Sequence, residues 1–578
     1  MHTADSSRMR TALENVRMLA ARRAAYAVLA IAFALLPVCL LALALGAGGW
    51  TAWEVIAFLS LAVTAPWVGN LAASSLIGAL VLIASRDTLA AVWPGVARIE
   101  GVPRNRTALL LCLRNEDTDA ALGRLAPLLD GLAAAGAGDR FALFVLSDTP
   151  AGPHAEAEAR AVAAFRAART APPAVHYRRR EANTGFKAGN VMEWVRHGSA
   201  GFEAMITLDA DSAMTAEAVL ELARLAEANP KAALIQSLIV ARPALVPFPR
   251  LFQFGMRHGM RVYAAGIAWW QGPDGPYWGH NAILRIAPFA AHAELPTLPG
   301  GQAILSHDQV EAALLRGAGY EVRLDPRETG STEANPPSLL PFLVRDIRWM
   351  AGNLQYLALL GLPQFTAVGR LNLVYAILLF ASAPLALVAA AALLGNALSP
   401  DPAAAVDRGL GLAATLAWLG CYFSHKLLGV LQAALDPAVR ATYGGGARLA
   451  LGAAVEFAHG LALETIRAVN QTGGMVALAL GRRIGWAPQA REERGIAWGE
   501  AARGLWWHSL VGVAALAGFA AAGLVPFLWA LPFLGGLALA IPLCVVTSDP
   551  ALGRLLARRG IASIPEENGC RWPHSPAV

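Results

Sequence analysis

The sequence predicts a multi-pass α-helical membrane protein with an α/β domain inserted between two groups of membrane-spanning helices. The chain has 578 residues, of which 56% are hydrophobic and only 15% are charged, whereas an ordinary soluble domain is about 45–50% apolar and ~25% charged. The apolar excess lies in residues 24–84 and 370–547. The stretch between them, residues 85–340, has the composition of a soluble domain, which gives the predicted order of the parts.

Membrane-spanning helices are predicted from apolar runs of about 20 residues. Residues 24–46 form one such run, and residues 55–84 contain a second. The C-terminal candidates are residues 371–395, 409–435, 504–526 and 527–547. Residues 448–481 carry several charges, so they fit either two short spans or helices at the membrane interface. We therefore expect two spans before the α/β domain and four to six after it.

The arginines predict which side of the membrane each part faces. Five of them precede the first span, and the loop between the first two spans has none. Because Lys and Arg accumulate on the cytoplasmic side, residues 1–23, the α/β domain and the tail at 548–578 should be cytosolic. The net charge of +6 suits anionic lipid headgroups and gives no reason to expect nucleic acid. The five cysteines form no CxxC pair that would suggest zinc or a disulfide framework.

Within the α/β domain, short apolar runs alternate with amphipathic segments. Helices are expected at 118–136 and 215–229, and strands at 107–115, 141–149, 174–179, 204–211 and 232–240. This alternation predicts a mostly parallel sheet with helices on both faces. Ligands bind beyond the carboxyl ends of such strands. Polar side chains gather at these ends, namely Asn115 with Glu116 beside it, Asp148, Arg178, Asp209 and Asp211.

The string "LDADS" gives the acidic part of the predicted site. Side chains two apart on an extended chain point the same way, so Asp209 and Asp211 should face one cation. Carboxylates together with phosphate oxygens suit Mg²⁺ or Mn²⁺. The alternative is a polar loop after a strand. Asp148 fits either a nucleotide-binding carboxylate or a turn aspartate.

Two further motifs supply a cation and a base. Lys187 lies in "TGFKAGN", where a helix start and an amine both favour phosphate; the alternative is a solvated basic loop. Asp308 lies in "LSHD" at the start of an amphipathic helix, with Ser306 as the expected N-cap. Asp308 is interpreted as a general base that accepts the proton of an attacking hydroxyl, and the alternative is stabilisation of the helix dipole.

An acceptor site is expected from two aromatic motifs. The turn "GPYWGHNAILR" contributes Trp278, Gly279, His280 and Asn281, and "RDIRWMAGN", within interfacial helices at 341–369, contributes Arg345, Arg348 and Trp349. Sugar rings stack on aromatic faces, and glycine permits close backbone approach. The alternatives are core aromatics and positive-inside anchoring with an interfacial tryptophan.

The order of these motifs resembles that of processive family 2 glycosyltransferases such as cellulose and hyaluronan synthases. In that family the third string is usually TED and the fourth QxxRW, whereas this chain has "SHD" and Arg345. These departures, together with "YWGHNAILR" and "TSDPALGRLLARRGIASIPEE", resemble the glucans biosynthesis glucosyltransferase H family from about residue 20 to residue 567.

The resemblance implies a GT-A (Rossmann-like) glycosyltransferase domain in a multi-pass enzyme of the bacterial inner membrane. That family polymerises glucose from UDP-glucose into the β-1,2-linked backbone of osmoregulated periplasmic glucans, and we expect inverting transfer, dependence on Mg²⁺ (or Mn²⁺) and coupling to export. Asp308 would be the base. The nucleotide sugar would contact Asn115, Glu116, Asp148, Arg178, Lys187 and Asp209, with Asp209 and Asp211 at the metal and the aromatic and arginine motifs at the acceptor.

Partners and regulation follow from the same resemblance. The growing β-glucan and the lipid bilayer are expected partners, as are acyl carrier protein, reported for some family members, and periplasmic glucan-processing proteins. Residues 482–498 are expected to form a gating-type cytosolic loop over the donor pocket. Two other functions stay open from the sequence: another processive polysaccharide synthase, and a glucan transporter or osmosensor with an inactive transferase-like domain.

Overall fold

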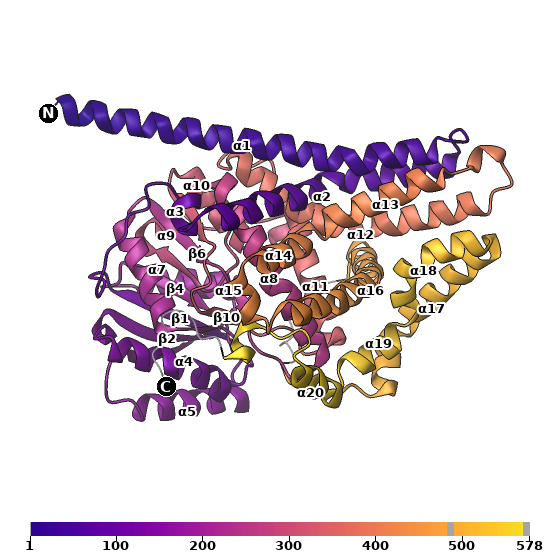
Figure 1. Cartoon of the computed structure of the whole chain (residues 1–578). Helices are drawn as coiled ribbons and strands as arrows, with labels where there is room; N and C mark the ends of the chain where they lie inside the picture. The colour runs from indigo at the N-terminus through magenta and orange to yellow at the C-terminus, as the bar shows by residue number, and fades with distance from the viewer. Residues whose placement is uncertain (1, 483–490, 570–578) are drawn as a thin grey trace.

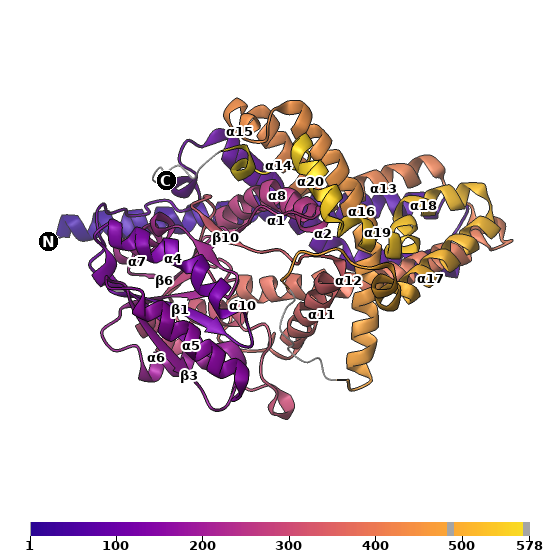
Figure 2. The same cartoon turned by 90° about the horizontal axis from the view of Figure 1, so that it is seen from below.

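The computed structural model describes residues 2–482 and 491–569. The α/β domain lies at one end of the molecule and most of the apolar helices at the other, while the long N-terminal helix α1 (His2–Leu45) runs beside both (Figure 1). Viewed from below, α11 (Leu339–Leu354) lies between the α/β domain and α17 (Trp498–Ala522) (Figure 2). The predicted insertion of an α/β domain between apolar helices is therefore confirmed.

A seven-stranded sheet organises the α/β domain. Its order is β3-β2-β1-β4-β8-β6-β9, and β8 is antiparallel to both of its neighbours while the other pairs are parallel. The strands are β1 (Thr107–Leu113), β2 (Phe141–Ser147), β3 (Ala174–Arg179), β4 (Ala204–Leu208), β6 (Ala232–Ser237), β8 (Ala282–Arg285) and β9 (Glu321–Asp325). Five of them match the predicted strands.

Alternating side chains hold the sheet between two helical layers. Leu109 and Leu111 of β1 belong to one buried cluster, and Ala108 and Leu110 belong to the other, as the two-residue period of a strand requires. The domain helices are α3 (Thr88–Val92), α4 (Thr118–Ala134), α5 (Pro153–Ala167), α6 (Phe186–His197), α7 (Ala216–Ala228), α9 (Ile286–His292) and α10 (Asp308–Gly317).

A second, three-stranded sheet lies beside the carboxyl edge of the first. It consists of β5 (Ala213–Met214), β10 (Ser331–Glu333) and β7 (Val240–Ala241), in the order β5-β10-β7. The β5–β10 pair is antiparallel and the β10–β7 pair is parallel. This small sheet positions Glu333, because β10 pairs with β5, the strand that follows β4.

Five helices are long and apolar enough to cross a membrane among the described residues, or six when the bent pair α18 and α19 is counted as one span. They are Val16–Leu45 of α1, α2 (Ala52–Ala84), α12 (Ala367–Ala397), α16 (Gly446–Ala479) and α17 (Trp498–Ala522), with α18 (Leu524–Ala538) and α19 (Ala540–Thr547) bent by 57°. The sequence had suggested six to eight spans.

Two segments differ from the simplest expectation for a span. The apolar stretch 409–435 is divided at Phe423 into α13 (Arg408–Tyr422) and α14 (Ser424–Leu435), neither of which is long enough to cross alone. The charged stretch 448–481 forms one continuous helix, α16, in which Glu456 is paired with Lys426 and Glu464 with Arg467. The remaining helices are α15 (Pro437–Thr442) and α20 (Pro550–Arg559).

The domain is held against the membrane helices by α8 (Pro247–Gln271) and α11. Gly266 of α8 lies so close to α2 that an added Cβ would be 1.7 Å from the carbonyl oxygen of Ser74, so only glycine fits there. On α11, the Asp346 carboxylate accepts a hydrogen bond of 2.6 Å from Gln471 of α16. These contacts fix the position of the α/β domain relative to the membrane helices.

Candidate active site

A cavity of about 270 Å³ lies beyond the carboxyl ends of β1, β2 and β4. It is closed by the turn before β8, the start of α10, the helix α11 and the segment that follows residue 490. All of the predicted site residues line it except Arg178 and Asn281; those present are Asn115, Glu116, Asp148, Lys187, Asp209, Asp211, Trp278, Gly279, His280, Asp308, Arg345, Arg348 and Trp349.

Asp148 is held by Arg180, whereas Arg178, which was predicted to contact the nucleotide sugar, does not line the cavity. The Arg180 guanidinium donates to both carboxylate oxygens, at 2.7 and 3.0 Å, and both side chains are buried. Arg178 pairs in register with Leu146 inside the sheet, and it binds Asn190 and Glu193 of α6 instead. Arg178 therefore supports α6 from within the sheet, whereas Arg180, one residue beyond β3, reaches the edge.

Asp209 is neutralised by Lys187, which lies in the first turn of α6. The Lys187 Nζ forms an ion pair with Asp209 and donates to the Gly279 carbonyl oxygen at 2.8 Å. Burial opposes ionisation, but Lys187 and His280 hold the pKa of Asp209 well below its usual range. The Lys187 amine thus connects the turn at residues 209–212, which we call the acidic turn, to the turn that contains Trp278 and Gly279, which we call the aromatic turn.

The extended-chain premise used to predict that Asp209 and Asp211 face one cation does not hold, although both residues line the same cavity. Strand β4 ends at Leu208, and residues 209–212 form a turn in which the Ser212 N–H donates to the Asp209 carbonyl oxygen at 3.0 Å. The extended-chain rule therefore does not apply. Asp209 pairs with Lys187, while Asp211 pairs with Arg491, and the two carboxylates reach the same cavity from different directions.

Arg491 enters the site from the segment between α16 and α17. Its guanidinium pairs with Asp211, and its Nε lies 3.0 Å from Glu116 Oε2. Within the segment predicted at 482–498 to cover the donor pocket, residues 483–490 lie outside the described part of the chain. Of the described remainder, Arg491 lines the cavity.

Asp308 lies at the start of α10 within a small group of titratable side chains. The helix begins at Asp308 with His307 as its N-cap residue, so the assignment of Ser306 as N-cap is wrong. His307 Nε2 is 3.3 Å from Asp308 Oδ1, and its Nδ1 is 3.0 Å from Glu311 Oε2. Burial lowers the pKa of His307, but Glu311 and Asp308 outweigh it and raise the pKa to about 9.

The aromatic turn approaches Asp308 through a glycine. Gly279 has a φ of +86°, and an added Cβ would lie 2.9 Å from the Asp308 carboxylate carbon, so a side chain here would displace that carboxylate. His280 Nε2 is 3.3 Å from Glu333, and Trp278 lines the cavity. Asn281 lies outside the cavity, where it is fully buried and its Nδ2 donates to Ser331 Oγ at 2.9 Å.

Helix α11 supplies the wall nearest the membrane helices. Arg345 and Arg348 are buried, whereas the Trp349 side chain is 47% exposed. The Arg345 guanidinium carbon lies 4.3 Å from the centre of the Trp349 ring, a cation–π contact that fixes the ring. Burial lowers the pKa of Arg345 to about 10, although Glu333 opposes the shift. An exposed aromatic face beside fixed cations suits an acceptor that brings hydroxyl groups.

Two carboxylates, Asp209 and Asp211, are the candidate metal ligands. The described residues contain no group of three or more His, Cys, Asp or Glu side chains arranged to hold a metal ion. This set fits Mg²⁺ only as a shared site, because Mg²⁺ binds through one or two carboxylates with substrate phosphates and water completing the shell. The Arg491 guanidinium, paired with Asp211, already places a positive charge at that carboxylate.

Sequence reasoning missed three residues of the site. Arg180 carries the ion pair with Asp148, Glu333 pairs with His280, and Arg491 reaches Asp211. Arg180 could have been found from its place one residue beyond a predicted strand, opposite Asp148. No local pattern marks Glu333, which lies more than 50 residues from its partner. Arg491 lies in the segment 482–498 that was predicted to cover the donor pocket, but it was not singled out there.

Comparisons with known proteins agree with this arrangement. Residues 112–292 match the family described as glycosyl transferase family 2, and residues 204–425 match glycosyl transferase family group 2. The chain is 35% identical over 567 residues to a protein of Caulobacter vibrioides named glucans biosynthesis glucosyltransferase H, covering 91% of this chain and 84% of that protein. A protein of the same name from Xanthomonas campestris is 33% identical, with 87% and 80% covered.

Proposed function

The chain belongs to the glucans biosynthesis glucosyltransferase H family, and from that premise we propose that it polymerises glucose from UDP-glucose into a β-1,2-linked glucan backbone. The catalytic domain would face the cytoplasm of a bacterium and the apolar helices would lie in its inner membrane. The linkage, the donor and the site of action are parts of this proposal, and they rest on the family.

One observation carries the proposal: a single cavity brings together Asp209, Asp211 and Asp308 with Trp349, which lies next to the membrane helices. An inactive transferase-like domain would be expected to have lost these carboxylates. Here each is held by specific neighbours, Asp209 by Lys187 and Asp211 by Arg491. This retention favours an enzyme over a transporter or sensor.

The donor would bind at the acidic turn. Lys187 and Arg491 would face the diphosphate, and Asp148, held in place by Arg180, would contact the nucleoside. Such fixed cations stabilise the negative charge that develops on a leaving diphosphate. When bound, Mg²⁺ held by Asp209 and Asp211 with the phosphate oxygens would supply further stabilisation of that charge.

The transfer step would use Asp308 as the base. An acceptor hydroxyl, positioned against Trp349 and Trp278, loses its proton to the Asp308 carboxylate while its oxygen bonds to C1 of the donor glucose. The bond from C1 to the diphosphate oxygen breaks, and UDP departs with that electron pair. Attack from the face opposite to the leaving group inverts the configuration at C1. General base catalysis of this kind contributes about 10²–10⁴-fold to a rate.

Export of the product is part of the same proposal. Trp349 lies on α11, which is joined to α16 by the hydrogen bond between Gln471 and Asp346, so the acceptor end of the glucan would lie near the membrane helices. The growing glucan and the lipid bilayer are therefore the proposed partners. Acyl carrier protein and periplasmic glucan-processing proteins are proposed from the family alone.

The test uses membrane vesicles with labelled UDP-glucose. Wild-type protein should release UDP and yield a glucan whose linkage analysis shows β-1,2 bonds, and Asp308→Asn should lower UDP release by about 100-fold or more. Asp130→Asn is the matched control, because Asp130 is an exposed carboxylate paired with Arg169 outside the cavity. Equal UDP release by wild type and Asp308→Asn would remove the catalytic assignment, and a β-1,4 product would indicate a cellulose-type synthase.

A further inference from the structure

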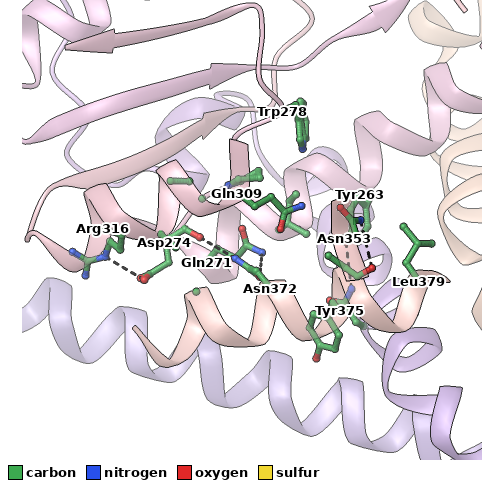
Figure 3. A pocket seen from close by; sticks show the side chains of 18 of the residues that line it. Tyr263, Gln271, Asp274, Trp278, Gln309, Arg316, Asn353, Asn372, Tyr375 and Leu379 are labelled. Carbon is green, nitrogen blue, oxygen red and sulfur yellow. Dashed lines mark hydrogen bonds and ion pairs between the residues drawn. The ribbon is translucent and has the colours of Figure 1, made fainter. Parts of the chain in front are cut away.

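A second cavity, of about 180 Å³, lies between the α/β domain and the membrane helices (Figure 3). It shares Trp278 with the catalytic cavity, so the two are neighbours on either side of one indole. Five amide side chains line it, and we call it the amide pocket: Asn70, Gln271, Gln309, Asn353 and Asn372. They come from α2, α8, α10, α11 and α12, respectively.

Two of the five amides, those of Gln271 and Asn353, have hydrogen-bonding capacity that the protein does not fully use. Gln271 Nε2 donates to Asn372 Oδ1 at 3.0 Å, but Gln271 Oε1 has no partner among the described residues, although the residue is only 5% exposed. The Asn353 amide makes one long bond of 3.5 Å to the Ala376 carbonyl oxygen. Buried acceptors without partners are rare in folded proteins, so a bound group with hydroxyl donors would satisfy them.

Four aromatic side chains also line the pocket. Trp67, Tyr263, Trp278 and Tyr375 line the pocket, and the Tyr263 hydroxyl accepts a hydrogen bond of 3.3 Å from Asn70. Tyrosine and tryptophan offer an apolar ring face with a polar edge. Amides beside such faces match a ligand that has hydroxyl groups at its rim and C–H groups on its faces.

The charges of the pocket are paired within the protein. Asp274 is bound by Arg23 at 2.6 Å and by Arg316 at 3.2 Å, and Thr366 Oγ1 also donates to it at 2.8 Å. A phosphate would have to compete with the Asp274 carboxylate for Arg316, which lines the pocket. A lipid acyl chain would leave the buried Gln271 Oε1 without a partner, which is costly in an apolar setting. The ligand that fits is neutral and polyhydroxylated.

We infer that the amide pocket binds a neutral saccharide unit beside the catalytic cavity. This inference rests on the proposed function, which brings such units to this face of the membrane helices. Two polar members, Asn70 and Asn372, lie in helices apolar enough to span a membrane, where polar side chains usually mark a ligand path. The amides and aromatic rings of the pocket would bind either a glucose unit of the growing glucan or a free glucose molecule that starts a chain.

The test measures sugar binding to the full-length protein in lipid nanodiscs by calorimetry. The probes are glucose and a β-1,2-linked glucose trisaccharide, each compared for wild type, Asn353→Leu and Gln309→Met. Both variants keep side-chain volume and remove the amide, and we expect each to weaken sugar binding by about 10-fold. Asn470→Leu is the control, since its amide also donates to a backbone carbonyl oxygen, that of Leu343, but outside both cavities.

The outcomes separate this inference from the proposed function. UDP binding within about two-fold of wild type shows that a variant is folded, and Gln309→Met keeps the test open if Asn353→Leu does not fold. Binding of the trisaccharide alone supports the glucan as the source, and binding of glucose supports the free sugar. Unchanged sugar binding in both variants overturns the inference, and the proposed function is unaffected as long as the wild type releases UDP from UDP-glucose. Absence of UDP release in the wild type overturns the proposed function instead.

Discussion

Arg491 forms an ion pair with Asp211, although the two residues belong to different halves of the molecule. Arg491 lies between α16 and α17, and Asp211 lies in the turn after β4. The Arg491 Nε also lies 3.0 Å from Glu116 Oε2. Burial opposes the charge, but Asp211 and Glu116 raise the pKa of Arg491 above its usual value. The connection between two apolar helices thus supplies a permanent positive charge to the acidic turn of the site.

Removal of this charge should change the metal requirement. In Arg491→Gln, the Mg²⁺ concentration that gives half-maximal UDP release should fall by about 5-fold, because a partly exposed ion pair no longer competes for Asp211. Arg494→Gln is the control, since Arg494 pairs with Glu500 at the exposed surface. An unchanged Mg²⁺ requirement in Arg491→Gln would show that Asp211 does not bind the metal.

Loss of the Lys187 amine should weaken donor binding. Lys187→Met removes the partner of Asp209 and the hydrogen bond to the Gly279 carbonyl oxygen, so the KM for UDP-glucose should rise by roughly 10-fold or more. Lys231→Met, which changes an exposed lysine, should leave KM at the wild-type value. A change in kcat with no change in KM would place Lys187 away from the bound diphosphate.

His307 should make stability depend on pH above neutrality. Burial opposes its charge, but Glu311 and Asp308 raise its pKa to about 9, above the ordinary value of ~6.5. Its contribution to stability is therefore complete below about pH 6.5 and is lost as the pH rises through 9. The unfolding temperature of wild type should fall more than that of His307→Gln between pH 7 and pH 10. His280 also has a pKa of about 9, so the difference between the two proteins isolates His307; parallel curves would contradict the prediction.

Gly279→Ala should impair catalysis more than folding. The new Cβ would lie 2.9 Å from the Asp308 carboxylate carbon, at a φ of +86°, so the base must move. We expect kcat to fall by about 100-fold, as for loss of a positioned base. Gly136→Ala is the control, because Gly136 has a φ of +69° with nothing within 4 Å of the added carbon, and it carries the same backbone strain alone. Equal kcat losses in the two variants would remove the steric explanation.

The sequence could predict those parts of the site that depend on local pattern. Strand β1 was expected at 107–115 and extends over Thr107–Leu113, because a buried parallel strand is a continuous apolar run. Asp148 and Asp209 were placed at strand ends for the same reason. The strand predicted at 174–179 matches β3 and contains Arg178, whereas Arg180 lies one residue beyond its end and reaches Asp148. Composition does not show which of three consecutive arginines makes that contact.

By itself, the sequence determined which segments are apolar enough to enter a membrane, which alternate as strands and helices, and which carboxylates follow strands, because these properties depend on neighbouring residues. Only the tertiary structure decided that β8 enters the sheet antiparallel, that Gly279 lies against Asp308 and that Arg491 pairs with Asp211. Those relationships join residues between 29 and 280 positions apart, so they depend on how distant segments pack together, which no local pattern records.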